Sequence, residues 1–215
     1  MSRKLLLIIS ILGLRLSTIA QLDPKAEEIL NKLSAKYEAI KSYKASFSYE
    51  LENPQSKVNE KFKGDIIVKG QKFHISLGNQ IIINNGTTVW TLLKEENEVT
   101  ISDYSPEDDE ISPTKIYSIY KNGYKYLWVE EEKSKSGIMD IVDLVPDDKK
   151  KPFFKIRLWI NKKSNEIVKW RIFEKNGNRY NYVISEFSLN PKIEEGKFDF
   201  DKTKYPGVDV QDLRN

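Results

Sequence analysis

Four consecutive β-strands are indicated by residues 64–90, which read GDIIVKGQKFHISLGNQIIINNGTTVW. Apolar and polar residues alternate along this stretch, a pattern typical of strands that bury one face. Gly70-Gln71, Gly78-Asn79 and Asn85-Gly86 separate the strands as turn signals. Asn85-Gly86 is the strongest of them, because Asn and Gly tolerate the positive φ angles of a two-residue hairpin turn. The stretch therefore predicts an antiparallel meander.

The faces of this meander can be assigned locally. If Gly70-Gln71 forms a two-residue turn, Val68 lies opposite Phe73 and Ile66 lies opposite Ile75. One face then collects Ile66, Val68, Phe73, Ile75 and Leu77. In the hairpin that follows, Ile81, Ile83, Thr88 and Trp90 share a face. At least one face of the predicted sheet is therefore markedly apolar.

Similar signals continue on both sides of the meander. Strands are predicted at 44–52, 59–69, 71–77, 80–84, 87–92, 98–103, 124–132, 138–145, 153–161, 166–174 and 179–189. Asp23-Pro24 begins a helix that should run to about Lys41, and Ser112-Pro113 begins a second helix that Asn122-Gly123 ends. Roughly eleven strands and two helices predict a mostly β (α+β) protein. So large an antiparallel sheet should curl toward a barrel.

Composition excludes several classes of function. The chain has 35 Lys+Arg, 32 Asp+Glu, one His and no Cys. Three of the basic residues lie in the first twenty positions, so the remainder is balanced and has no general electrostatic reason to bind nucleic acid. Cys-based zinc sites, thiol nucleophiles, disulfides and multi-His metal centres are excluded. We therefore predict no catalytic residues, metal or cofactor, and we expect His74 to be a surface residue.

The first twenty residues have the three parts of a secretory signal. Arg3 and Lys4 precede an apolar run from Leu5 to Leu14, and Thr18-Ile19-Ala20 offers a cleavage site. The run is too short for the ~20 residues that span a bilayer. We therefore predict a signal peptide at 1–20, cleaved near Ala20, and a single soluble domain at 21–215 in an extracytoplasmic space.

The order of motifs in the remaining chain resembles the LolA-type outer-membrane lipoprotein carriers, periplasmic proteins of Gram-negative bacteria. The initial helix resembles the family's opening pattern at Ala26-Glu27-Glu28-Ile29-Leu30. Residues 64–73 resemble its Gly-x-Leu…Phe hairpin, and residues 82–90 resemble its Asn/Asp-Gly turn with a Trp-bearing strand. Ser112-Pro113, 142–146 and 206–210 are similar to the start of its lid helix and to its later signatures. Together these motifs cover nearly the whole chain after the signal.

The resemblance implies an unclosed β-barrel whose helical lid covers a hydrophobic cavity for the acyl chains of lipoproteins or other lipids. Such a periplasmic carrier takes its cargo from an inner-membrane lipoprotein-releasing transporter and passes it to an outer-membrane acceptor; we expect a monomer. On this interpretation the cavity wall consists of Ile66, Val68, Phe73, Ile75, Leu77, Ile81, Ile83 and Trp90. The lid packs through Ile29, Leu33, Ile116, Ile119 and Tyr120.

One departure and several alternatives accompany this interpretation. The family commonly has Arg-Pro after the strand that ends at Lys69, and that Arg is linked to lid closure. Here the positions read Gly70-Gln71, and Lys69 lacks the planar fork of Arg. The apolar face is either ordinary core or a lipid-binding wall. A periplasmic sensor of similar fold is the alternative function, and an enzyme is disfavoured. The acidic run 107–110 is best interpreted as a solvated loop.

Overall fold

The computed structural model describes residues 23–105, 115–135 and 137–214. The predicted signal peptide, the acidic run 107–110 and the first residues of the predicted second helix, 112–114, lie outside these residues. The described elements are, in chain order, α1 (Pro24–Glu38), β1 (Ser42–Asn53), β2 (Val58–Lys69), β3 (Lys72–Leu77), β4 (Gln80–Asn84), β5 (Thr88–Leu93), β6 (Glu98–Asp103), the 3₁₀ turn η1 (Ile119–Lys121), β7 (Tyr124–Ser134), β8 (Gly137–Pro146), β9 (Phe153–Asn161), β10 (Glu166–Glu174), β11 (Arg179–Leu189), the 3₁₀ turn η2 (Lys202–Lys204) and β12 (Asp209–Asp212).

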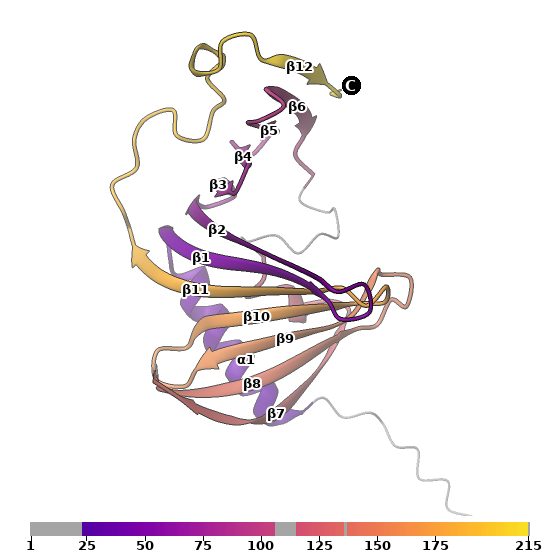
Figure 1. Cartoon of the computed structure of the whole chain (residues 1–215). Helices are drawn as coiled ribbons and strands as arrows, with labels where there is room; N and C mark the ends of the chain where they lie inside the picture. The colour runs from indigo at the N-terminus through magenta and orange to yellow at the C-terminus, as the bar shows by residue number, and fades with distance from the viewer. Residues whose placement is uncertain (1–22, 106–114, 136, 215) are drawn as a thin grey trace, which may run out of the picture.

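The twelve strands of the described residues form one sheet, in the order β12-β6-β5-β4-β3-β2-β1-β11-β10-β9-β8-β7. Neighbouring strands are antiparallel except β12 and β6, which are parallel. The sheet curls, but its end strands β12 and β7 lie far apart, so the barrel is not closed (Figure 1). The prediction of a mostly β protein with a curled, unclosed antiparallel barrel is therefore confirmed. The four-residue strand β12 was not predicted, because so short a segment shows no alternation.

The helix α1 is fixed at its first turn by one carboxylate. Oδ1 of Asp23 accepts hydrogen bonds from the backbone N–H groups of Lys25 (2.9 Å) and Ala26 (3.3 Å), and Pro24 follows at the first helical position. Oδ2 of Asp23 accepts a further bond from the backbone N–H of Trp128 in β7 (2.8 Å). The cap therefore also fastens α1 to the edge of the sheet. In the described residues, no helix has the length and apolarity needed to cross a membrane.

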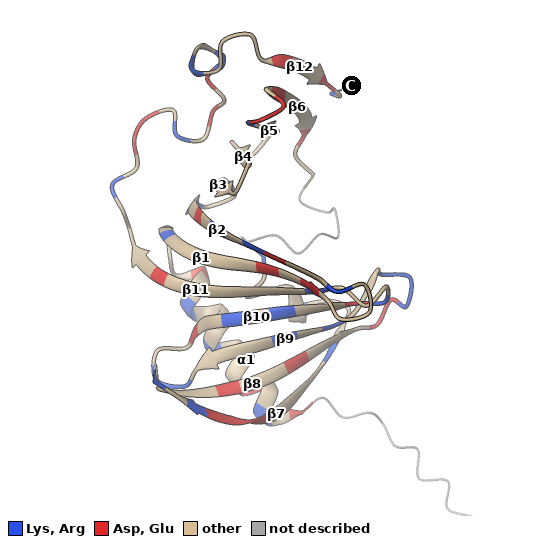
Figure 2. Ribbon diagram, viewed as in Figure 1, with Lys and Arg blue, Asp and Glu red and all other residues tan. Residues whose placement is uncertain are grey.

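The main core lies between α1 and the concave face of β7–β10. Figure 1 shows α1 lying along β7–β10. Leu30 and Leu33 of α1 are completely buried there, together with Val142, Leu144, Ile156 and Leu158 of β8 and β9. By the alternation of the strands, the residues between these on β8 and β9 face outward, and Asp143 and Arg157 are among them. Figure 2 shows charged positions along both strands. Arg157, for example, donates from Nε to Oδ1 of Asp143 at 2.6 Å. The period of two thus makes the concave face apolar and puts charged pairs on the outer face, where Met139, Ile141 and Trp159 also form a small buried cluster.

The predicted second helix is wrong in the residues that the structure describes. Residues 115–118 form a turn, and only Ile119–Lys121 follow as a single 3₁₀ turn. The stretch contains the isoleucines and tyrosines at 116, 117, 119 and 120, residue types with modest helix propensity, and it ends at Gly123. Packing of these large side chains against the core, rather than helix formation, fixes this segment.

The outer face of β5 and β6 has a core of its own. Leu92 and Val99 are almost completely buried, and they pack against Val208 and neighbouring apolar side chains of the C-terminal segment. This segment leaves the end of β11 and passes along the sheet to β12 (Figure 1). We call residues 190–213 the C-terminal strap. The main core therefore lies on the concave face of β7–β10, and a second core lies on the outer face of β5 and β6.

Candidate functional site

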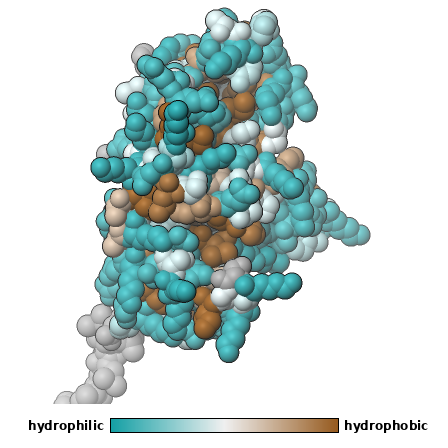
Figure 3. All heavy atoms as spheres, turned by 90° about the vertical axis from the view of Figure 1, so that its left-hand side faces the viewer, coloured by the Kyte–Doolittle hydropathy of each residue, from teal (hydrophilic) through white to brown (hydrophobic). Residues whose placement is uncertain are grey.

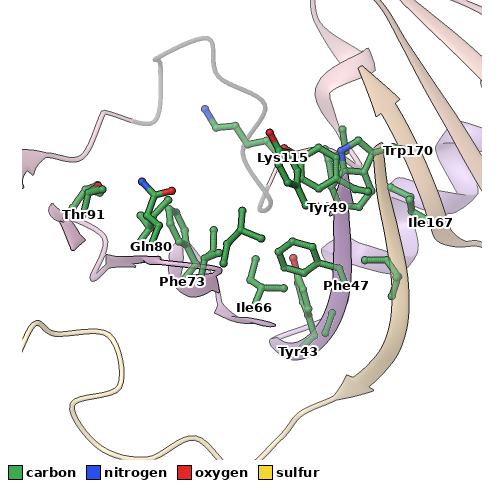
Figure 4. Close-up of a pocket in the computed structure, with 18 of the residues that line it drawn as sticks. Tyr43, Phe47, Tyr49, Ile66, Phe73, Gln80, Thr91, Lys115, Ile167 and Trp170 are labelled. Atoms are coloured by element: carbon green, nitrogen blue, oxygen red, sulfur yellow. The ribbon is translucent and has the colours of Figure 1, made fainter. Parts of the chain in front are cut away.

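A pocket of about 720 Å³ lies on the concave face of the sheet. It lies between two groups of strands, β1, β10 and β11 on one side and β2–β6 on the other, and side chains of both groups line it (Figure 4). Its volume is within the range of about 300–1,000 Å³ found for small-molecule pockets. On the left-hand side of the molecule as seen in Figure 1, apolar side chains reach the surface among polar ones (Figure 3). The sheet therefore holds a space of ligand size on its apolar face.

The apolar wall of the pocket is built by strands in register. Ile66 of β2 lies opposite Ile75 of β3, and Ile75 lies opposite Ile82 of β4. Tyr43, Ala45 and Phe47 of β1 continue the wall on the other side of β2 and are buried. Because directly opposed residues of antiparallel strands point to the same face, these side chains form a continuous apolar surface.

Gly64 is required for the position of one side chain in this wall. It lies opposite Phe47, and a Cβ atom at residue 64 would be 2.6 Å from Cζ of Phe47 and 2.9 Å from the carbonyl oxygen of Ser76. The backbone oxygen cannot yield as a flexible side chain can. A residue without a side chain at position 64 therefore leaves room for the ring of Phe47, which lines the pocket.

The opposite side of the pocket is aromatic. Trp170 of β10 stacks on Tyr182 of β11 with ring centroids 4.5 Å apart, and Tyr182 lies 5.2 Å from Tyr49 of β1. These three residues pair across adjacent strands. Burial raises the pKa of Tyr182 far above its ordinary value, and it raises the pKa of Tyr49 to about 12. The phenols are therefore neutral at physiological pH, and this wall adds no charge to the pocket.

Polar residues are concentrated in the part of the lining that comes from β4–β6 and the chain beyond them. They are Gln80, Thr91, Ser102, Asp103, Ser105 and Lys115. Figure 4 shows Gln80 and Thr91 on one side of the pocket, while Phe47, Ile66 and Tyr43 lie on the other. The pocket is therefore amphipathic, with an apolar part and a polar part.

The structure places four of the predicted wall residues in the pocket lining. They are Ile66, Phe73, Ile75 and Leu77. Val68 is buried in the same apolar cluster but is not among the lining residues. Whether this wall binds lipid stays a prediction.

The other three predicted wall residues, Ile81, Ile83 and Trp90, lie on the outer face of the sheet. This corrects the shared wall expected from the sequence. The turn at Gly78-Asn79 makes Leu77 pair with Gln80, so Ile75 meets Ile82 while Ile83 meets His74. The pocket face of β4 and β5 is supplied instead by Ile82, Val89 and Thr91. The two-residue turn rule used at Gly70-Gln71, applied again at Gly78-Asn79, would have found these residues.

The predicted lid residues come together in the main core. Leu33, Ile116 and Tyr120 are buried, and Ile29 and Ile119 pack against the same cluster. The Tyr120 hydroxyl donates to Oδ1 of Asn31 at 2.8 Å, which ties the 3₁₀ turn to α1. Ile116 also lines the pocket. That this unit opens for cargo stays a prediction.

Two further predicted residues lie away from the pocket. His74 is half-buried on the outer face, where burial and the nearby ammonium of Lys197 lower its pKa to about 4. Lys69 pairs with Lys72, so it shares the outer face with His74 rather than pointing into the pocket. The charged side chain of Lys69 therefore points away from the pocket.

Known proteins share both the sequence pattern and the fold. The family model described as "Outer membrane lipoprotein carrier protein LolA" matches residues 38–201. Among solved structures, an uncharacterized conserved protein from Thermus thermophilus is 13% identical, covers 89% of this chain and 99% of its own, and has a TM-score of 0.59. No curated protein matches the chain. At this identity, the likeness to the solved structure shows the fold alone.

Two other structures are similar over most of the chain, with TM-scores below 0.5. A putative outer membrane lipoprotein-sorting protein domain from Vibrio parahaemolyticus is 14% identical, with 82% of this chain and 97% of the other covered and a TM-score of 0.45. A LolA superfamily protein from Nitrosomonas europaea is 12% identical, with 82% and 98% covered and a TM-score of 0.41.

Proposed function

We propose, from the premise that this chain belongs to the LolA family of outer membrane lipoprotein carrier proteins, that it is a periplasmic carrier which binds acyl chains in its pocket. The observation that carries the proposal is the 720 Å³ pocket on the concave face, with its apolar wall of Ile66, Phe73, Ile75 and Ile82. Acylated cargo is supported by the name of the family, which refers to lipoprotein carriers, and by the apolar wall of the pocket.

The energetics of an apolar wall suit a carrier. Each methylene removed from water contributes about 0.8 kcal/mol, so ten methylenes contribute about 8 kcal/mol before the cost of ordering the chain. This attraction is strong but not directional, because it depends on area rather than on hydrogen-bond geometry. A cargo held in this way can move to a more apolar acceptor. We therefore propose transfer from an inner-membrane lipoprotein-releasing transporter to an outer-membrane acceptor.

The proposed working form is a monomeric single domain, residues 21–215, released from its signal peptide in the periplasm. The buried unit of Leu33, Ile116 and Tyr120 acts in this proposal as the movable side of the pocket. Ile116 supports this role, because it belongs to the main core and to the pocket lining at once. Movement of this unit would change the width of the pocket without breaking the sheet.

Native mass spectrometry of the exported protein, followed by lipid extraction, tests the proposal. We expect the mature chain to carry acylated lipoproteins or lipids that extraction releases and identifies. Purification from cells should yield many lipoproteins in association with it. An empty protein that associates instead with one membrane regulator would contradict the carrier function and would support a sensor.

A further inference from the structure

The concave face becomes steadily more polar from β3 to β6. On β3 the pocket side chains are Phe73, Ile75 and Leu77, all apolar. Across the neighbouring strands, Ile75 of β3 pairs with Ile82 of β4, which pairs with Thr91 of β5. Leu77 of β3 pairs with Gln80 of β4. On β6 the lining residues are Ser102, which pairs with Val89, and Asp103. A ligand that lies across these strands therefore passes from an apolar environment to hydroxyl and amide groups.

The polar end of the pocket also contains an ammonium group. Of the described residues that line the pocket, Lys115 is the one cation and Asp103 is the one anion. In Figure 4 the Lys115 side chain extends from the side of Tyr49 and Trp170 toward the side on which Gln80 and Thr91 lie. The charge of Asp103 acts on Arg214 at the C-terminus, where it contributes to raising the pKa of the guanidinium.

Among the described residues, no carboxylate lies within ion-pairing distance of Lys115. An ammonium group beside an apolar wall attracts an anion more strongly than one in bulk water, because the local dielectric constant is lower.

We propose that this pocket takes amphiphiles with an anionic head group, whose head lies at Lys115 against Gln80, Thr91 and Ser102. The acyl tail lies on the wall of Phe47, Phe73 and Ile75. This inference rests on the proposed function and narrows its cargo to a chemical class. The Lys115 ammonium has three donors for the oxygens of a carboxylate or phosphate, and the neutral hydroxyl and amide groups donate to the oxygens that remain. The head group thereby sets the orientation of the tail.

Displacement of a neutral fluorescent probe, N-phenyl-1-naphthylamine, from the full mature chain tests this inference. The competitors share one chain length: palmitate, palmitoyl lysophosphatidate and hexadecanol. The first two distinguish a free fatty acid from a phospholipid as the source of the anion, and hexadecanol has the tail without the charge. Lys115→Gln removes the charge, Lys115→Arg keeps it, and Lys44→Gln is the matched control. Lys44 is exposed on β1 between two pocket residues and points away from the pocket.

The wild-type chain and Lys44→Gln should bind at least one of the two anionic competitors about tenfold more tightly than hexadecanol. Lys115→Gln should lose this preference while it binds hexadecanol as before, and Lys115→Arg should retain most of it. A preference that survives in Lys115→Gln, or equal binding of all three competitors by the wild type, would overturn the inference and leave the carrier function in place. Failure to bind any of the three would overturn both.

Discussion

The adjacent isoleucines of β4 offer the sharpest test of the pocket. Ile81 and Ile82 are both half-buried and belong to the same strand, but they point to opposite faces. Ile82 lines the pocket, whereas Ile81 packs on the outer face against the cluster of Leu92 and Val99. Replacement of each by Asn makes the same chemical change on two faces of one strand. The pair therefore separates a binding effect from a folding effect.

The expected magnitudes follow from the apolar surface that each side chain covers. An isoleucine side chain that becomes buried against a ligand contributes about 1.5–3 kcal/mol, so Ile82→Asn should weaken acyl binding by about tenfold to a hundredfold. Its effect on the free energy of unfolding should be smaller than that of Ile81→Asn, because Ile82 packs at the margin of the apolar cluster of Ile66 and Ile75 and also faces the pocket. Ile81→Asn should instead lower the free energy of unfolding by about 1.5–3 kcal/mol, through lost burial under the C-terminal strap, and leave binding unchanged.

The assay combines urea unfolding with titration of a fluorescent fatty acid, both on the mature chain. Each 1 kcal/mol of stability should also move the melting temperature by about 2–4 °C in a chain of this size. If Ile82→Asn destabilises the protein as much as Ile81→Asn does, Ile82 is part of a packed core. If both variants bind fatty acid as well as the wild type, the pocket is not the acyl site. Either result would refute the proposed wall.

Three further predictions use other features of the same fold. Gly64→Ala should lower the free energy of unfolding by about 1–3 kcal/mol, because the added methyl group overlaps the ring of Phe47 and a backbone oxygen. A melting temperature equal to that of the wild type would contradict this. The pKa of His74 in the folded protein is about 4, below its ordinary value of 6.5, so the unfolded chain binds more protons between these pH values. The free energy of unfolding should therefore fall as the pH drops from 6.5 to 4. In urea unfolding, His74→Gln should reduce this dependence and leave lipid binding intact, and an unchanged pH dependence would argue against the lowered pKa. Hydrogen exchange should be faster in residues 115–121 than in β5 of the empty protein and should slow when lipid binds; equal rates with and without lipid would indicate a fixed part of the core.

Much of the sheet could be predicted from the sequence because its strands are regular. Clear turn signals and a period of two located eleven of the strands, and Asp23-Pro24 located the helix. The prediction of the wall failed at one step, the parity across Gly78-Asn79. Ile81-Ile82-Ile83 is apolar on both faces, so hydrophobicity alone does not distinguish the pocket side from the outer side.

The second core could not be anticipated in the same way. Leu92 and Val99 look like ordinary inward-facing residues, and the side chains that cover them, such as Phe200, Tyr205 and Val208, follow no period in the sequence. Only the tertiary course of the C-terminal strap shows which face of β5 and β6 it protects. The aromatic row of Tyr49, Tyr182 and Trp170 depends likewise on the pairing of β1 with β11, which joins distant parts of the chain.

The course of the C-terminal strap has a consequence for the time order of folding. Residues 98–101 complete their pairing only with residues 209–212, and Leu92 and Val99 have no cover until Val208 arrives. Contacts between such distant segments form slowly, because a long loop must close before they stabilise the protein. The half of the sheet that carries the polar end of the pocket therefore cannot mature before the C-terminal strap has been synthesised and has packed on it. Folding molecules should pass through a stage in which β7–β11 and α1 are formed but the pocket is not.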